Sequence, residues 1–257
     1  MSGVLNDVGD GILEEGGRML AELMARRAST VTLRAGTIMF LDGDPLDTLY
    51  EVRRGVVRCF TVAEDGQKHI FSFSCQGALI GLGAAEQWHY TAEAVGQVSL
   101  RVLPRSVLSA AMRANPLLGE WRARMVDVTV QAREQQLLTM ASRTAEERLM
   151  VFLRDFAEAA GPDLQRAGGA TALPMSRRDI AEHLGISFET VSRGFTSLKR
   201  RGALELIGPG VYRIRDASAA EGVRPRRAAL RMTGARGERA LDEVDALEDE
   251  MYRPQAV

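Results

Sequence analysis

The stretch that decides the fold of this 257-residue chain is RRDIAEHLGISFETVSRGFTSLKRRG, residues 177–202. Ile180 and Leu184 fall on one face of a first short helix, which Gly185 ends because glycine readily adopts the left-handed conformation of a tight turn. Ser187 precedes a second helix as its N-cap. Three apolar residues at helical spacing form the inward face of that second helix: Val191, Phe195 and Leu198. Two helices joined by a short glycine turn predict a helix-turn-helix.

The outward face of the second helix has the chemistry of a surface that reads DNA bases. The carboxylate of Glu189 can accept from a cytosine amino group, and the guanidinium of Arg193 can hold guanine O6 and N7 with two hydrogen bonds. Phe188 offers apolar contact to a thymine methyl group. We expect base contacts from Phe188, Glu189, Ser192 and Arg193, and phosphate contacts from Arg177, Arg178, Ser187, Thr190, Lys199 and Arg201. The alternative is that an amphipathic helix pair simply carries its charges outside.

The segments that follow the helix pair add a wing and a tail. Residues 204–207 and 211–214 are short β-prone runs joined by a Gly-Pro-Gly turn, which predicts a wing. Residues 217–257 are rich in Ala, Arg and Glu and lack a sustained apolar stripe, so we expect a disordered tail with a short helix near residues 241–251. The arginine-rich half of the tail either adds nonspecific DNA affinity or is a solvated extension.

A long helical pattern precedes the helix-turn-helix over residues 116–142 and begins with Pro116, a residue favoured in the first turn of a helix. Five of its residues are spaced 3, 4, 3, 4, like the seam of a two-stranded coiled coil: Leu118, Trp121, Met125, Val128 and Ala132. We expect this seam to pair two copies of the chain; the alternative is that the stripe packs on its own domain. A second helix over residues 144–160 opens with Thr144 and Glu147 at capping-box spacing.

The N-terminal half of the chain reads as strands. Its β-prone runs lie at residues 31–33, 48–52, 56–62, 69–73 and 98–103, with glycines between them. Regular turns between short strands predict an antiparallel sandwich or barrel, in which Asp65-Gly66 is the strongest hairpin turn. We expect a helix before the strands over residues 12–27, although Gly16 and Gly17 weaken its first half, so that its firm part starts at Arg18.

The overall composition is that of an ordinary soluble protein: 46% of the residues are hydrophobic, 26% are charged, and the formal net charge is -1. No apolar run reaches the ~20 residues of a membrane span, and the acidic N-terminus does not look like a signal peptide. We therefore expect no membrane association and a cytoplasmic location. Cys59 and Cys75 cannot build a disulfide framework, and with three scattered histidines they leave little material for a metal site.

Three stretches of the chain carry a family resemblance. LPMSRRDIAEHLGISFETVSR, residues 173–193, resembles the helix-turn-helix of the CRP/FNR transcription regulators, and its E-T-V-S-R run is typical of the FNR and FixK branches. AEERLMVFL, residues 145–153, resembles the helix that follows that family's dimerisation helix. Residues 33–60 resemble the start of its cyclic-nucleotide-binding-type β-roll. The resemblance covers residues 33–215 in a consistent order.

The resemblance implies a mode of action. Family members are homodimers whose two recognition helices enter successive major grooves of a pseudo-palindrome. FNR-type members read TTGAT-type half-sites with residues that correspond to Glu189, Ser192 and Arg193. They also recruit RNA polymerase through exposed loops, which in this chain correspond to residues 63–68 and part of residues 161–170.

Two departures from the family concern its signals. FNR proper holds an iron–sulfur cluster on N-terminal cysteines, but this chain has no cysteine before Cys59, and Arg101 stands about where the β-roll ligand would be. Members that bind cyclic AMP carry an arginine for the cyclic phosphate, but this chain has no arginine from residue 77 to residue 100. We therefore expect no cofactor, and FixK-type regulators, which lack the cluster and often act without a ligand, fit best.

Together these patterns predict an α+β protein with an N-terminal β-roll, a long dimerisation helix and a C-terminal winged helix-turn-helix. The expected divisions are a helical segment at 1–28, a β-roll of sensor type at 29–115, the dimerisation helix at 116–142, the winged helix-turn-helix at 143–216 and the tail at 217–257. The expected function is sequence-specific DNA binding by a transcription regulator, an activator rather than a repressor, with double-stranded DNA, RNA polymerase and a second copy as partners.

Two rival interpretations stay open at this point. The first is a ligand-gated regulator of the same family that senses a nucleotide or a haem in the β-roll. The second is an enzyme that uses Cys75 as its nucleophile, with His69 or His89 as the base. The second interpretation lacks a recognisable orienting acid or oxyanion site.

Overall fold

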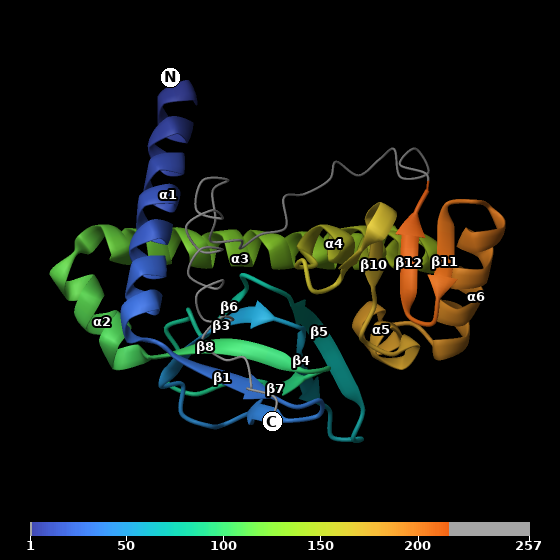
Figure 1. Cartoon of the computed structure of the whole chain (residues 1–257), viewed down its shortest axis with the longest axis horizontal. Coiled ribbons are helices and arrows are strands. Elements are labelled where there is room, and N and C mark those ends of the chain that lie inside the picture. Colours follow the sequence, from blue (N-terminus) through green and yellow to red (C-terminus); the bar gives the residue numbers. More distant parts are fainter. Residues whose placement is uncertain (1, 216–257) are drawn as a thin grey trace, which may run out of the picture.

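A computed structural model describes residues 2–215; the tail predicted over residues 217–257 lies outside this range. The described chain is α+β, as predicted, with a β-roll, one long helix that crosses it, and a small helix-and-wing unit at the far end of that helix (Figure 1). None of the helices within residues 2–215 is both long and apolar enough to cross a membrane.

The β-roll consists of two four-stranded antiparallel sheets. The first has the order β1 (Ser29–Leu33), β8 (Val98–Pro104), β3 (Thr48–Arg54), β6 (Leu79–Ile80). The second has the order β2 (Ile38–Phe40), β7 (Thr91–Ala94), β4 (Val57–Val62), β5 (Lys68–Ser74). All five predicted runs are strands, and Gly66 turns the β4–β5 hairpin at a positive φ of 82°. The two-to-four-residue strands β2, β6 and β7 were not predicted, because so few residues show no periodicity.

The first helix, α1 (Ser2–Arg27), corrects the prediction that glycines weaken its N-terminal half. Gly16 lies where α1 crosses the long helix, and a Cβ atom at this position would overlap the side chain of Trp121. The glycine therefore allows two helices to approach closely instead of ending one of them.

The next three helices along the chain come directly after the β-roll. The short helix α2 (Arg105–Ala114) was not predicted; its segment was included in the β-roll domain without an element of its own. The long helix α3 (Pro116–Ser142) has the predicted bounds, and Asn115 caps it by accepting from the N–H of Leu117 at 3.0 Å. The next helix, α4 (Ala145–Ala159), begins with the predicted capping box of Thr144 and Glu147.

The apolar seam of α3 is turned towards the chain's own core. Leu118, Trp121 and Met125 are 1%, 1% and 7% exposed and pack with Leu20 and Met24 of α1. The prediction that these three residues pair two copies is wrong, because Gly16 lets α1 cover them. The alternative interpretation, a stripe packed on its own domain, is the correct one for this part of α3. The remaining predicted residues, Val128 and Ala132, are half-buried.

The winged helix-turn-helix is built from α4, α5 (Arg177–Leu184), α6 (Phe188–Arg200) and a third antiparallel sheet. The predicted wing is formed by β11 (Leu204–Gly208) and β12 (Val211–Ile214). The sheet continues through β10 (Ala170–Ala172) to β9 (Gln165–Arg166), with a 3-10 turn, η1 (Ala167–Gly169), between them. These short elements lie mostly within residues 161–170, part of which the family resemblance gives as an exposed loop.

Replacing Gly16 by valine is expected to lower the free energy of unfolding by about 1–3 kcal/mol, because the new side chain overlaps Trp121 and α1 must shift. The matched control is Gly11→Val in the same helix, where nothing lies within 4 Å of the added Cβ, so stability should change little. Urea unfolding followed by tryptophan fluorescence measures both. Equal losses in the two variants would show that helix propensity, not the crossing, sets the effect.

Candidate nucleic-acid interface

The first helix of the pair, α5, begins and ends through local hydrogen bonds. The hydroxyl of Ser176 accepts from the N–H of Asp179 at 3.1 Å, and the Asp179 carboxylate accepts from the N–H of Ser176 at 2.8 Å. Gly185 ends the helix at a φ of +63°, as predicted. These caps fix the direction in which the chain enters α6.

The second helix, α6, has the predicted inward face. Its N-cap Ser187 accepts from the N–H of Thr190 at 3.1 Å. Three residues fill the core beneath it and are at most 3% exposed: Val191, Phe195 and Leu198. Gly194 is buried on the same side, and a Cβ there would lie 2.8 Å from the tip of Leu149 on α4. The close crossing of α6 over α4 explains a glycine in mid-helix, where it costs ~1 kcal/mol relative to alanine.

The outward face of α6 carries the four predicted base-reading residues. Phe188 is 47% exposed, Glu189 and Arg193 are exposed, and Ser192 is half-buried. Hydrogen bonds from its own backbone N–H and from the N-cap hydroxyl hold the pKa of Glu189 below its usual value, so the side chain is an ionised acceptor. Arg177 reaches across from α5 and donates to the Ser192 hydroxyl at 3.4 Å. Acceptor and donor groups thus stand together on one exposed surface, and their contacts with bases stay a prediction.

The predicted phosphate-binding residues fall into three groups. Arg177 and Arg178 are exposed at the start of α5, while Lys199 and Arg201 are exposed at the end of α6. Arg201 already forms an ion pair with Glu146 of α4, so a phosphate would have to compete for it. The third group consists of Ser187 and Thr190, whose hydroxyl oxygens lie 3.0 Å apart in the N-terminal cap of α6.

An ion-pair bridge that sequence reasoning missed docks this unit on the β-roll. Arg58 of β4 donates to Glu93 of β7 at 2.6 Å and to Asp179 of α5 at 2.7 Å. Asp179 is also the capping residue of α5, so the bridge ties the start of that helix to the second sheet. Arg58 and Asp179 are 121 positions apart, and no local pattern in the sequence links them.

The other end of α5 is docked through His183. Its Nδ1 lies 3.1 Å from the carbonyl oxygen of Ile70 in β5, and its ring lies 5.3 Å from the rings of Phe73 and Phe152. Burial lowers the pKa of His183 to about 4, so the ring is neutral at pH 7. Since a carbonyl can only accept, the proton of the neutral ring sits on Nδ1. Burial, not this hydrogen bond, therefore keeps the imidazole neutral.

Comparison with known proteins supports the assignment of a β-roll followed by a helix-turn-helix. The family model "Cyclic nucleotide-binding domain" matches residues 30–115, and "Crp-like helix-turn-helix domain" matches residues 147–219. The chain is 35% identical over 176 residues to the nitrogen fixation regulation protein FixK of Rhizobium meliloti, covering 68% of this chain and 77% of that protein. It is 32% identical over 185 residues to the transcriptional activator protein FnrA of Stutzerimonas stutzeri, covering 70% and 74%. The structure of FixK2 from Bradyrhizobium japonicum matches with a TM-score of 0.71 at 28% identity, covering 77% of this chain and 98% of that chain.

The chain belongs to the CRP/FNR family, in its FixK-like branch. It is a DNA-binding transcription regulator, as predicted. The rival interpretation as a cysteine-dependent enzyme is set aside, because the matched relatives are regulators. Cys75 is 4% exposed inside an apolar cluster, and burial raises the pKa of Cys59 to about 12, so neither environment activates a thiol.

The β-roll of this CRP/FNR member does not fit a cyclic nucleotide held in the usual manner. Aromatic rings pack together inside it, contributed by Phe40, Tyr50, Phe71, Trp88 and Tyr90. Phe40 and Trp88 are stacked at 3.6 Å, and Phe71 meets Tyr90 edge-on at 5.0 Å. Residues 77–100 supply no guanidinium for a phosphate. Side chains occupy this interior, and the FixK-like assignment agrees with that.

The docking contact of His183 makes stability depend on pH. The unfolded chain takes up a proton near pH 6.5 but the folded chain only near pH 4, so the free energy of unfolding is largest above pH 6.5 and falls as the pH drops towards 4. In His183→Asn, whose amide can still donate to Ile70, this part of the slope is expected to disappear, a change on the order of a few kcal/mol. Urea midpoints between pH 7 and pH 4 measure it.

The matched control for this prediction is His89→Asn, on an exposed side chain far from the docking contact in sequence. It should keep the slope of the native chain. Identical slopes in the native chain and in His183→Asn would contradict the assignment.

Proposed function

We propose that this regulator binds a TTGAT-type pseudo-palindrome as a homodimer in the cytoplasm and activates transcription from it. The observation that carries the proposal is the exposed face of α6, where Glu189, Ser192 and Arg193 stand side by side on a capped and well-packed helix. A carboxylate that accepts from cytosine and a guanidinium that grips guanine each discriminate by ~1–3 kcal/mol. The flanking cations at both helix ends supply affinity and register.

The structure supports a dimer through a different face of α3 from the predicted one. Val130 and Leu137 are 51% and 66% exposed, and Val126 is half-exposed one turn earlier. These residues are spaced 4 and 7 apart, which is heptad spacing, and the exposed small residues Ala123 and Ala141 extend the row. We call these five residues the outer seam. A two-fold axis along it would place two copies of α6 for half-sites about one duplex turn apart.

The remaining parts of the proposal concern activation. Residues 29–115 would be the sensor-type unit, 116–142 the dimerisation helix and 143–216 the DNA-binding unit. The tip of the β4–β5 hairpin at residues 63–68 and part of residues 161–170 are the surfaces proposed to meet RNA polymerase. Most residues of both segments are exposed. One relative, FnrA, is named as a transcriptional activator.

The native chain should bind a duplex with TTGAT and its inverted partner more tightly than a scrambled duplex at the same salt concentration. Arg193→Ala should weaken operator binding by ~1–3 kcal/mol and relax discrimination at one base pair. Lys199→Ala should weaken binding to all sequences alike and reduce the salt slope by about one. Fluorescence anisotropy with single-base-pair variants of the duplex measures both. Equal affinity of the native chain for operator and scrambled duplex would end the specificity proposal.

Leu137→Glu should turn the dimer into a monomer, because it places a charge in the outer seam of each copy. The matched control is Leu138→Glu, since Leu138 is 59% exposed but lies roughly 100° further around α3. Sedimentation velocity across a concentration series gives the oligomeric state of both variants. A control that dissociates as readily as Leu137→Glu would show that the seam lies elsewhere.

A further inference from the structure

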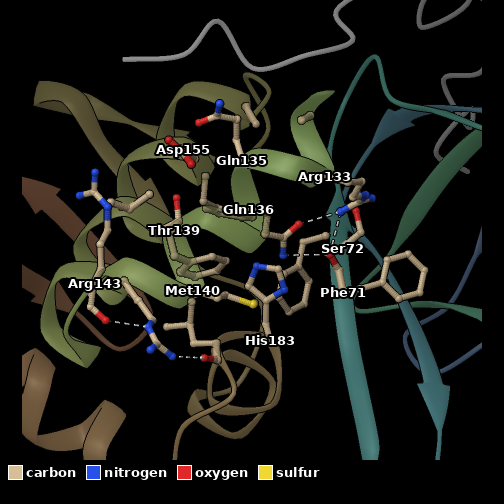
Figure 2. Close-up of a pocket in the computed structure, with 18 residues that line it drawn as sticks. Phe71, Ser72, Arg133, Gln135, Gln136, Thr139, Met140, Arg143, Asp155 and His183 are labelled. Atoms are coloured by element: carbon tan, nitrogen blue, oxygen red, sulfur yellow. Dashed lines mark hydrogen bonds between the residues drawn. The ribbon is translucent and has the colours of Figure 1, made fainter. Parts of the chain in front are cut away.

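A cavity of about 480 Å³ lies where the β-roll meets the winged helix-turn-helix (Figure 2). Its walls come from β5, the C-terminal half of α3, α4 and the end of α5. The volume is within the ~300–1,000 Å³ that small-molecule sites usually have, and junctions between units are a usual place for them. Phe71, one of the aromatic rings of the β-roll, also lines the cavity, which opens on the side of β5 that faces α3 and α4.

One wall of the cavity is apolar and rich in aromatic rings. Phe152 stacks on Phe156 with ring centres 6.0 Å apart and meets Phe73 of β5 at 5.9 Å. Met140 and Val151 also line this space. Rings and a thioether form a surface that suits a planar apolar molecule better than a sugar or a peptide.

The rim of the cavity is positively charged. Three guanidinium groups line it, against the single carboxylate of Asp155. Arg133 and Arg148 are committed to backbone carbonyl oxygens, at 2.9 Å for Arg133 and 3.0 Å for Arg148. Within residues 2–215 the guanidinium of Arg143 donates no hydrogen bond and interacts with Glu147 only electrostatically, so it can still grip a carboxylate with two parallel hydrogen bonds. An anionic group is therefore the complement that the rim lacks.

We propose that this cavity binds an organic anion with a planar aromatic body, of the class of aromatic carboxylates, with its ring against Phe152 and its carboxylate on Arg143. Such a molecule would touch the β-roll, α3 and the helix-turn-helix at once. It would bind best when these parts are docked as described, so its binding would stabilise that arrangement. This regulatory consequence rests on the proposed function, since the docked arrangement matters only if α6 reads DNA.

The proposed outer seam of α3 shares no residue with the lining of the cavity. The cavity is lined by Gln136, Thr139 and Met140, whereas the outer seam carries Val130 and Leu137. The proposed dimer and the proposed ligand would therefore contact different residues of α3.

The binding test uses the full chain without DNA and the probe 1-naphthoate, followed by isothermal titration calorimetry. One molecule per chain should bind, and the neutral analogue 1-naphthalenemethanol should bind about tenfold more weakly, because it lacks the charge. Arg143→Gln should weaken 1-naphthoate about tenfold and leave the neutral analogue unchanged. The matched control is Arg124→Gln, an exposed arginine of α3 outside the cavity, which should bind like the native chain.

The location of the probe is read from methyl resonances of methionine. The Met140 methyl signal should move during the titration, while that of Met19, which contacts Asn115 elsewhere, should not. Val151→Phe fills the cavity and should abolish binding; should this variant not fold, Arg143→Gln still decides. Absence of saturable binding, equal binding of the neutral analogue, or an unmoved Met140 signal would overturn the site.

The regulatory consequence has its own readout. At a 1-naphthoate concentration that occupies the native site but leaves a tenfold weaker site mostly empty, operator binding should tighten in the native chain and change much less in Arg143→Gln. An unchanged operator affinity with 1-naphthoate bound would overturn the regulatory role alone. A chain that binds 1-naphthoate but does not distinguish operator from scrambled duplex would overturn the proposed function and leave the site standing.

Discussion

The packing of Trp121 under Gly16 is the constraint on which the rest of the molecule depends. It sets the rotation of α3 about its own axis, because a residue 1% exposed against α1 cannot face anywhere else. Once that rotation is fixed, Val130 and Leu137 must point away from the core, and Gln136 must point towards β5. The crossing of α1 and α3 therefore determines which face of α3 stays free for a second copy. It also determines which face of α3 meets the DNA-binding unit, more than two helical turns beyond Trp121.

The same crossing shows where prediction from sequence stops. A 3, 4, 3, 4 spacing identifies one apolar stripe on a helix, but the period is the same whether a partner chain or the chain's own helix covers that stripe. Gly16 looked like a weak point of α1 because helix propensity is a local quantity, while its role depends on Trp121, more than a hundred positions away. The outer seam was not predicted, because alanine and valine among charged neighbours form a weaker apolar pattern than Leu118, Trp121 and Met125.

The helix-turn-helix was predictable because its determinants are neighbours in the chain. Ser176 with Asp179, Gly185, and Ser187 with Thr190 define both helices through bonds that span three residues. The wing and the long helix followed from equally local signals. The docking of that unit on the β-roll was not predictable, since the bridge from Arg58 to Asp179 joins segments 121 positions apart. Local chemistry thus predicted the reading surface, and only the tertiary structure reveals what orients it.

Asp179 connects these two levels, because one carboxylate both caps α5 and accepts from Arg58. Any change in the β-roll that moves Arg58 therefore acts on the first turn of the helix that supports the reading helix. Inside the β-roll, aromatic rings pack against one another. The junction between the two units, with its neutral His183 and its arginine-lined cavity, is a place where a small molecule would contact the elements that position α6. A ligand in that cavity would touch β5, α3 and α4 at once, so the proposed signal would be received next to the DNA-binding unit.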